Sequence, residues 1–204
     1  MVTLKVKKGE TYLLRIVNAA MNFQMYFHIA KHKLTVVETD CMLTKPYTTD
    51  VVLLAPGQTA DVLVTTDQAV DTYMMAASIF SPPDPSIVPY PQIPTTGLFV
   101  YDDTLETTFS ELKLPTFPKY NDTSFAHEYL MSLRSLNTKD HPAEVPKTID
   151  KNFLFTVGYS VSECPVGETC IGPQGGKVST SVNNVTFTTP NMAILQVSDN
   201  ISSK

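Results

Sequence analysis

The chain has 204 residues with a formal net charge of −5, and 43% of its residues are hydrophobic. A chain of this length can form one domain with a buried core, plus part of another. No run approaches the ~20 consecutive apolar residues that a membrane-spanning helix needs. No basic cluster is present, which argues against a nucleic-acid partner. The 26 Thr and 20 Val residues favour strands, so the composition predicts a mostly β protein.

Short strands separated by turns are predicted over the first hundred residues. The candidates are residues 2–6, 11–17, 25–30, 33–39, 50–54, 59–65, 72–79 and 97–101. Turn signals such as Ala55-Pro56-Gly57-Gln58 separate them. Short strands with frequent turns are typical of a β-sandwich or Greek-key barrel, which we expect to span residues 1–102.

The next stretch, residues 103–150, is predicted to be a connection with one helix. Six prolines between residues 81 and 95 first indicate an extended, irregular loop. The helix is indicated by a single apolar stripe and by N-cap oxygens at its start. The stripe consists of Phe125, Tyr129, Leu133 and Leu136, and the caps of Asp122, Thr123 and Ser124. We expect this helix to pack on the sandwich.

A second β pattern begins at residue 153. It runs through residues 153–158, continues at 178–182 and ends at 184–188. The stretch Gly172-Pro-Gln-Gly-Gly176 lacks the Lys-Ser/Thr of a phosphate-binding loop and is interpreted as a hairpin turn. Residues 151–204 are therefore predicted to be the incomplete start of a further β domain.

Glycosylation signals and cysteines indicate whether the protein is secreted or cytosolic. Asn121, Asn184 and Asn200 each begin an Asn-x-Ser/Thr triplet that accepts a glycan in secretory proteins. Cys164 and Cys170 bracket a turn-rich spacer and are either a small disulfide loop or two free thiols of a cytosolic protein. The triplets favour the disulfide. Cys41, in an apolar stretch, is expected to be a buried thiol.

No catalytic residue and no metal ligand is predicted from the residues themselves. His28 and His32 are four residues apart, but they fall on a strand and a turn, so their side chains need not converge on a metal ion. Cys41 as a third candidate ligand does not change this expectation. His127 and His141 have no partner in the sequence. We expect the carboxylates of Glu38, Asp40, Asp50 and Asp61 to cap backbone groups or form surface pairs.

Several stretches resemble plant laccases, which are blue multicopper oxidases. Residues 9–20 (GETYLLRIVNAA) and 27–40 (FHIAKHKLTVVETD) are very similar to the second cupredoxin domain of these enzymes. Residues 44–47, 55–59, 121–125, 133–136 and 155–158 also match, and residues 172–187 match the entry to the third domain. The resemblance covers about residues 3–196 and implies an all-β, cupredoxin-like Greek-key fold.

The same resemblance implies a function. The family oxidises lignin-type phenols and reduces dioxygen to water at copper centres. Its copper ligands lie in His-x-His, His-Pro-x-His-Leu-His-Gly and His-Cys-His motifs of the first and third domains, and none of these occurs here. His32 matches a family histidine that is not a ligand. We therefore expect this chain to bind no copper and to be inactive without flanking cupredoxin domains. The alternative is a non-catalytic cupredoxin-like module that binds a partner or small phenols.

Two further expectations follow from the resemblance. In fungal laccases the position matching Asn22 is a carboxylate that contacts the phenol, so Asn22 is the candidate substrate contact. The family also implies secretion to the apoplast, whereas residues 1–8 resemble a strand and have no apolar signal-peptide core. Because the family pattern is also lost after residue 196, we expect a laccase truncated at both ends.

Overall fold

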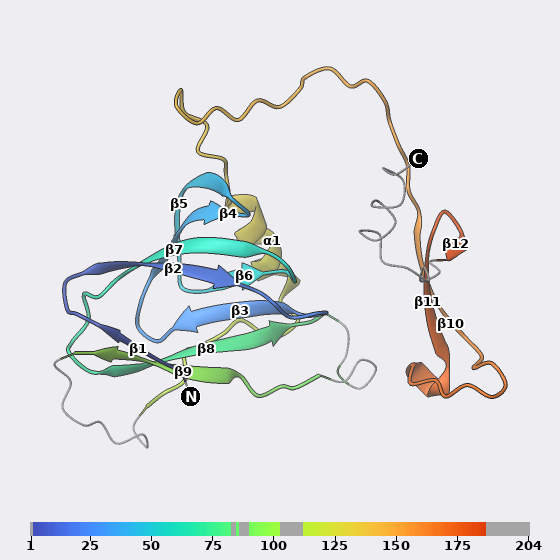
Figure 1. Ribbon diagram of the computed structural model, residues 1–204, viewed down its shortest axis with the longest axis horizontal. Helices are drawn as coiled ribbons and strands as arrows, with labels where there is room; N and C mark the ends of the chain where they lie inside the picture. Colours follow the sequence, from blue (N-terminus) through green and yellow to red (C-terminus); the bar gives the residue numbers. More distant parts are fainter. Residues whose placement is uncertain (1, 83–84, 86–89, 103–111, 187–204) are drawn as a thin grey trace, which may run out of the picture. The chain divides into compact units, whose positions relative to one another are not determined.

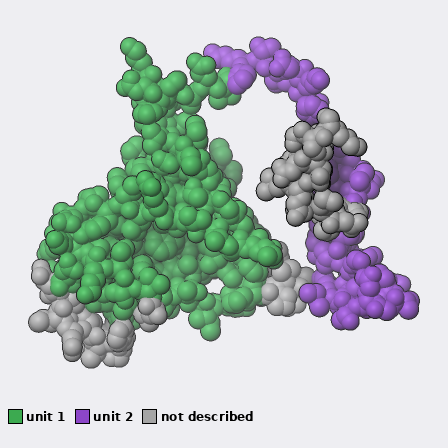
Figure 2. Space-filling view, viewed as in Figure 1, with its two compact units in different colours: residues 1–145 green, residues 146–204 purple. Residues whose placement is uncertain are grey.

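The computed structural model describes residues 2–82, 85, 90–102 and 112–186. The chain divides into two compact units, unit 1 (residues 1–145) and unit 2 (residues 146–204), as Figures 1 and 2 show.

Unit 1 is a sandwich of two sheets (Figure 1). The first sheet has the order β1 (Val2–Val6), β9 (Thr95–Tyr101), β8 (Thr72–Phe80), β3 (Gln24–Ile29) and β6 (Val52–Leu54). The second has the order β2 (Thr11–Val17), β7 (Thr59–Thr65), β4 (Leu34–Thr39) and β5 (Met42–Thr49). The chain crosses to the other sheet at β2, β3, β4, β6, β7 and β8, whereas the consecutive pairs β4–β5 and β8–β9 are hydrogen-bonded within one sheet. The all-β sandwich predicted from the sequence is confirmed.

The core lies between the two sheets because residues alternate in direction along each strand. Leu34 and Val36 of β4 face inward beside Val62 and Val64 of β7, and all four are completely buried. Tyr26 of β3 and Phe99 of β9 are buried from the other sheet. Each such side chain contributes about 1.5–3 kcal/mol through removal from water.

The predicted helix is α1 (Thr123–Ser132), and its N-cap is Asp122, whose carboxylate accepts a hydrogen bond from the Phe125 N–H at 2.9 Å. Phe125 and the buried Tyr129 stack with ring centroids 6.3 Å apart. The apolar stripe was predicted to continue to Leu136, but the backbone turns extended at Leu133. The Leu136 N–H then donates to the Leu43 carbonyl, so this residue lies beside β5 instead.

The strand β5 was missed, and Cys41 was predicted wrongly as buried. Lys45 and Pro46 interrupt the alternation in this stretch, and the structure places it at a sheet edge, where proline is tolerated. Cys41 is exposed because Asp40 and Cys41, with φ of 47° and 64°, form the left-handed turn between β4 and β5.

Unit 2 contains an antiparallel sheet of β10 (Val157–Ser162), β11 (Lys177–Val182) and β12 (Val185–Thr186). The strand predicted over residues 153–158 begins only at Val157 in the structure. The hairpin turn predicted at residues 172–176 is instead a 3₁₀ turn, Pro173–Gly175. The tight turn before β12 is made by Asn183 and Asn184, both with positive φ. Cys164 and Cys170 form a disulfide, with Cα atoms 5.8 Å apart, in the connection from β10 to β11.

Candidate functional site

The loop from β2 to β3 carries Asn22 and is held by the buried side chain of Asn18. The Asn18 amide donates to the carbonyl oxygens of Leu54 at 2.8 Å and Phe23 at 2.9 Å, and its side-chain oxygen accepts from the Ala20 N–H. A buried amide with all these partners satisfied fixes the backbone around it. The loop is therefore fastened to the end of β6, and Asn22 stands exposed at its turn.

Aromatic rings line up beside this loop. Phe23, the residue after Asn22, lies 5.7 Å from the ring centroid of Tyr90, and Tyr90 lies 6.1 Å from that of Tyr120. On the other side of Asn22 in the sequence, Met21 is 90% exposed. An exposed amide with an accessible apolar side chain and an aromatic row nearby can contact a flat ligand that bears a hydroxyl group.

His32 has a structural role in the core. Its Nδ1 lies 2.8 Å from the Ala30 carbonyl and its Nε2 lies 2.9 Å from the Tyr101 hydroxyl, which also accepts the Gln68 N–H. The ring packs edge-on against Tyr73 and Phe99. Burial lowers the pKa of His32 below its ordinary value of 6.5. Because both ring nitrogens are engaged, His32 has no lone pair left for a metal ion.

His28 is also tied to the backbone. Its Nδ1 lies 3.0 Å from the Thr116 carbonyl, and its ring meets Phe117 edge-on. Burial lowers the pKa of His28 as well. Cys41 lies in the β4–β5 turn, while His127 and His141 are exposed on α1 and in the segment after it. Over the described ranges, no three His, Cys, Asp or Glu side chains gather as a metal site would require. These residues do not fit a copper centre.

Three of the four carboxylates noted in the sequence have structural partners. Asp50 pairs with Lys33 at 2.7 Å and Asp61 with Arg15 at 3.3 Å, each pair being at least partly exposed. Asp40 accepts a hydrogen bond from the Thr59 N–H at 2.9 Å. Exposed pairs of this kind contribute about 0–1 kcal/mol each, so their role is local.

The predicted glycan acceptors lie at the surface where the structure describes them. Asn121 is exposed just before the N-cap of α1, and Asn184 is exposed in the turn before β12. Asn200 lies outside the described residues. In the part of the chain that is described, no helix has the length and apolar character needed to cross a membrane.

Two organising residues had no role in the sequence-based prediction. Asn18 fastens the loop that carries Asn22, and the buried Thr66 hydroxyl donates to the carbonyls of Lys7 and Glu10 while it accepts the Glu10 N–H. A polar residue directly after an alternating strand is the one local signal for both. Their partners lie up to 59 residues away, which no local pattern specifies.

Comparisons with known proteins agree with this architecture. The family model described as "Multicopper oxidase" matches residues 1–103. Laccase-4 of Arabidopsis thaliana is 44% identical over 192 residues, which are 94% of this chain and 33% of that protein. Laccase-12 of Oryza sativa subsp. japonica is 40% identical over 200 residues, which are 95% and 34% of the two chains. The chain thus spans about a third of the length of these curated relatives.

Solved structures show the same fold. Fet3p, a multicopper oxidase that functions in iron import, superposes with a TM-score of 0.62 over 93% of this chain and 32% of its own, at 22% identity. A mutant of the laccase from B. aclada superposes with a TM-score of 0.52 over 89% of this chain and 29% of its own, also at 22% identity. At such identities the likeness concerns the cupredoxin-like fold alone.

Proposed function

Because the chain belongs to the multicopper oxidase family, we propose that it forms the middle of a laccase. Residues 1–102 serve as the second cupredoxin domain, and residues 151–204 begin the third. Residues 103–150 connect these two domains. This assignment is supported by relatives called laccases at about 40% identity across nearly the whole chain. In this proposal the copper centres that oxidise phenols and reduce dioxygen are held by flanking cupredoxin domains.

The contribution of this chain is one wall of the phenol site. The observation that carries the proposal is the β2–β3 loop, in which Asn18 fixes the backbone and leaves Asn22 exposed near the row from Phe23 to Tyr120. Asn22 donates or accepts a hydrogen bond at the phenol hydroxyl, and the apolar neighbours contact the ring. Such contacts bind and orient the substrate, and the electron transfer takes place elsewhere.

Secretion to the apoplast is part of the same proposal. An exposed Asn121 and an exposed Asn184 are accessible to glycosylation. The disulfide between Cys164 and Cys170 is a bond that persists in oxidising compartments. Lignin-type phenols outside the cell are the proposed substrates.

The experiment uses a chimera in which residues 3–196 replace the matching third of a plant laccase. We expect the chimera, loaded with copper, to oxidise 2,6-dimethoxyphenol, whereas the 204-residue chain treated with copper does not. In the chimera, Asn22→Ala should raise KM several-fold and leave kcat unchanged, because it removes a contact made equally in the ground state and the transition state.

The matched control is Thr48→Ala, which alters an exposed polar residue of β5. It should leave both kinetic constants unchanged. Turnover by the 204-residue chain alone would contradict the dependence on flanking domains. An unchanged KM in the Asn22→Ala chimera would contradict the assignment of Asn22.

A further inference from the structure

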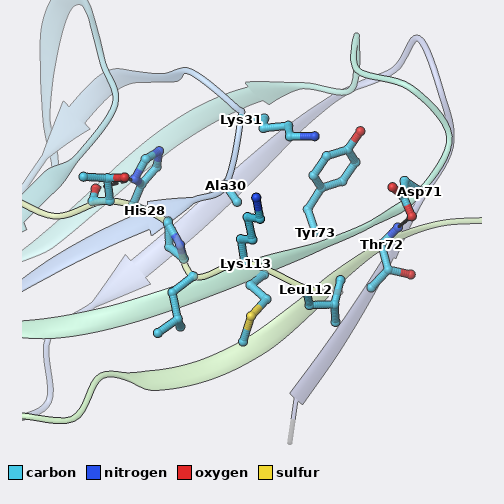
Figure 3. A pocket seen from close by; sticks show the side chains of 12 residues that line it. His28, Ala30, Lys31, Asp71, Thr72, Tyr73, Leu112 and Lys113 are labelled. Carbon is cyan, nitrogen blue, oxygen red and sulfur yellow. Dashed lines mark hydrogen bonds between the residues drawn. The ribbon is translucent and has the colours of Figure 1, made fainter. Parts of the chain in front are cut away.

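A cavity lies near the end of β3 that is farther from Asn22. It has a volume of about 400 Å³ and lies among the end of β3, the turn after it, the start of β8 and the segment 112–116 (Figure 3). Asn22, just before β3, and His28, near its end, are six residues apart, which corresponds to ~20 Å of extended chain. The cavity is therefore separate from the proposed phenol wall. Its size is in the range of pockets that hold small ligands.

Two lysines converge on this cavity. Figure 3 shows the side chains of Lys31 and Lys113 reaching toward the space beside the Tyr73 ring. The Lys31 ammonium lies 5.6 Å from the centroid of that ring. Among the described residues neither lysine forms an ion pair, whereas the nearby Lys33 is paired with Asp50. Two uncompensated ammonium groups at one cavity attract an anion.

Among the described residues that line the cavity, Asp71 is the one carboxylate, and it is engaged with the backbone. Asp71 accepts a hydrogen bond from the Thr72 N–H at 2.8 Å, directly at the start of β8. The described residues of the lining thus carry a net positive charge, from Lys31 and Lys113 against Asp71.

His28 adds a hydrogen-bond acceptor. Its Nδ1 faces the Thr116 carbonyl at 3.0 Å, and a carbonyl oxygen only accepts, so Nδ1 carries the proton of the neutral ring. The Nε2 atom is then an acceptor, and no hydrogen bond to it is found within the described ranges. Since His28 lines the cavity, a ligand hydroxyl can supply the missing donor.

Apart from Thr72 and Thr116, the remaining walls are largely apolar and suit a flat ligand. Tyr73 and Met74 line the cavity from β8, and Leu112, Leu114 and Pro115 line it from the later segment. Aromatic rings pack well against such surfaces, and a cavity of this volume holds one ring with its substituents.

We propose that this cavity binds a small hydroxylated aromatic carboxylate. The carboxylate is held by Lys31 and Lys113, the ring lies between Tyr73 and the leucines of segment 112–116, and the hydroxyl donates to Nε2 of His28. This site does not depend on the phenol wall at Asn22 or on copper.

The test titrates the 204-residue chain with 4-hydroxybenzoate and follows backbone amide signals by NMR. We expect saturable shifts confined to residues around Lys31, Tyr73 and Lys113. The neutral analogue 4-hydroxybenzamide should bind about tenfold more weakly, because it lacks the negative charge that pairs with the two lysines. Benzoate should bind about tenfold more weakly as well, because it lacks the hydroxyl that donates to His28. Equal binding of the amide, shifts at another surface, or no saturation up to ~10 mM would overturn the proposal.

Three variants sharpen this test. Lys31→Gln and Lys113→Gln should each weaken 4-hydroxybenzoate binding about tenfold and leave 4-hydroxybenzamide binding unchanged. Lys33→Gln is the matched control, because this lysine is close in sequence but is paired with Asp50, and it should change affinity less than about twofold. Both lysines are exposed, so their replacement should not impair folding. Affinity unchanged in both cavity variants would show that the ligand is bound elsewhere.

Discussion

Units 1 and 2 are built from similar strands but bury them very differently. In unit 1, Tyr26 and Val62 are fully buried because two sheets cover each other's apolar faces. In unit 2, Val157 is 80% exposed and Tyr159 is 64% exposed, since the described part of this unit holds a single three-stranded sheet. Strand alternation determines which residues share a face, but a second layer must be present before that face is buried.

In the described part of unit 2, local bonds hold the chain together in place of a buried core. The disulfide from Cys164 to Cys170 closes one loop, and Asn183 accepts hydrogen bonds from the Thr156 N–H and hydroxyl. Lys177 pairs with Glu168 at 3.0 Å on the surface. Exposed contacts of this kind are individually weak, so we expect side chains in unit 2 to matter far less for stability than those in unit 1.

The largest expected effect on stability is that of replacing the buried Tyr26, and the exposed Tyr159 is its matched control. Tyr26→Ala should lower the free energy of unfolding by about 3–5 kcal/mol, because it empties a buried site bordered by Phe80, Phe117 and Phe125. Tyr159→Ala should change it by less than about 0.5 kcal/mol. Urea unfolding followed by circular dichroism measures both. Similar losses in the two variants would mean that unit 2 has a core of its own.

A smaller loss is expected for the amide that fastens the β2–β3 loop. Asn18→Ala should cost about 2–3 kcal/mol, since it leaves the buried Leu54 carbonyl without this donor. Asn22→Ala, in the same loop but exposed, should cost less than about 0.5 kcal/mol. The same urea experiment checks both variants. A destabilised Asn22→Ala chain would imply that Asn22 also supports the fold. A raised KM in the Asn22→Ala chimera would then no longer identify a lost substrate contact.

A moderate effect is expected from pH. Burial lowers the pKa of His28 and His32 below 6.5, so the unfolded chain takes up protons more readily than the folded one. The stability of unit 1 should be complete above about pH 6.5 and should fall as the pH drops through that value toward the lower folded-state pKa. Urea midpoints at pH 7.5, 6.5 and 5.5 measure this slope.

The histidine variants identify the source of that slope. His32→Gln should lower stability at pH 7.5, because the bond to Tyr101 is altered, but it should flatten the dependence on pH. The same substitution at His127, which is exposed on α1, is the control. A slope unchanged in the His32 variant would assign the acid sensitivity to other groups.

The sequence predicted the sandwich because most strands of unit 1 have one buried face, which produces a regular alternation. It missed β5, where Lys45 and Pro46 break the pattern at a sheet edge. Cys41 was misjudged because its exposure depends on a turn geometry with positive φ, not on the apolar residues near it.

The candidate sites were harder to predict because they depend on residues far apart in the chain. Asn18 bonds to Leu54 across 36 positions, and His32 bonds to Tyr101 across 69. The cavity likewise combines Lys31 from a turn with Lys113 from a segment beyond β9. Only the family resemblance pointed to Asn22, because an exposed asparagine in a loop carries no distinguishing pattern.

The smallest expected effect is that of removing unit 2. Deleting residues 146–204 should leave the unfolding midpoint of unit 1 unchanged, because the buried core of unit 1 is formed by residues up to Tyr129. It should also reduce self-association, since the exposed Phe153, Leu154 and Val157 offer an apolar surface to other chains. Sizing chromatography and thermal unfolding of both chains measure these effects. A deleted chain that melts earlier or aggregates more would show that unit 2 stabilises unit 1, and the contrast between a self-sufficient core and an uncovered sheet would then be wrong.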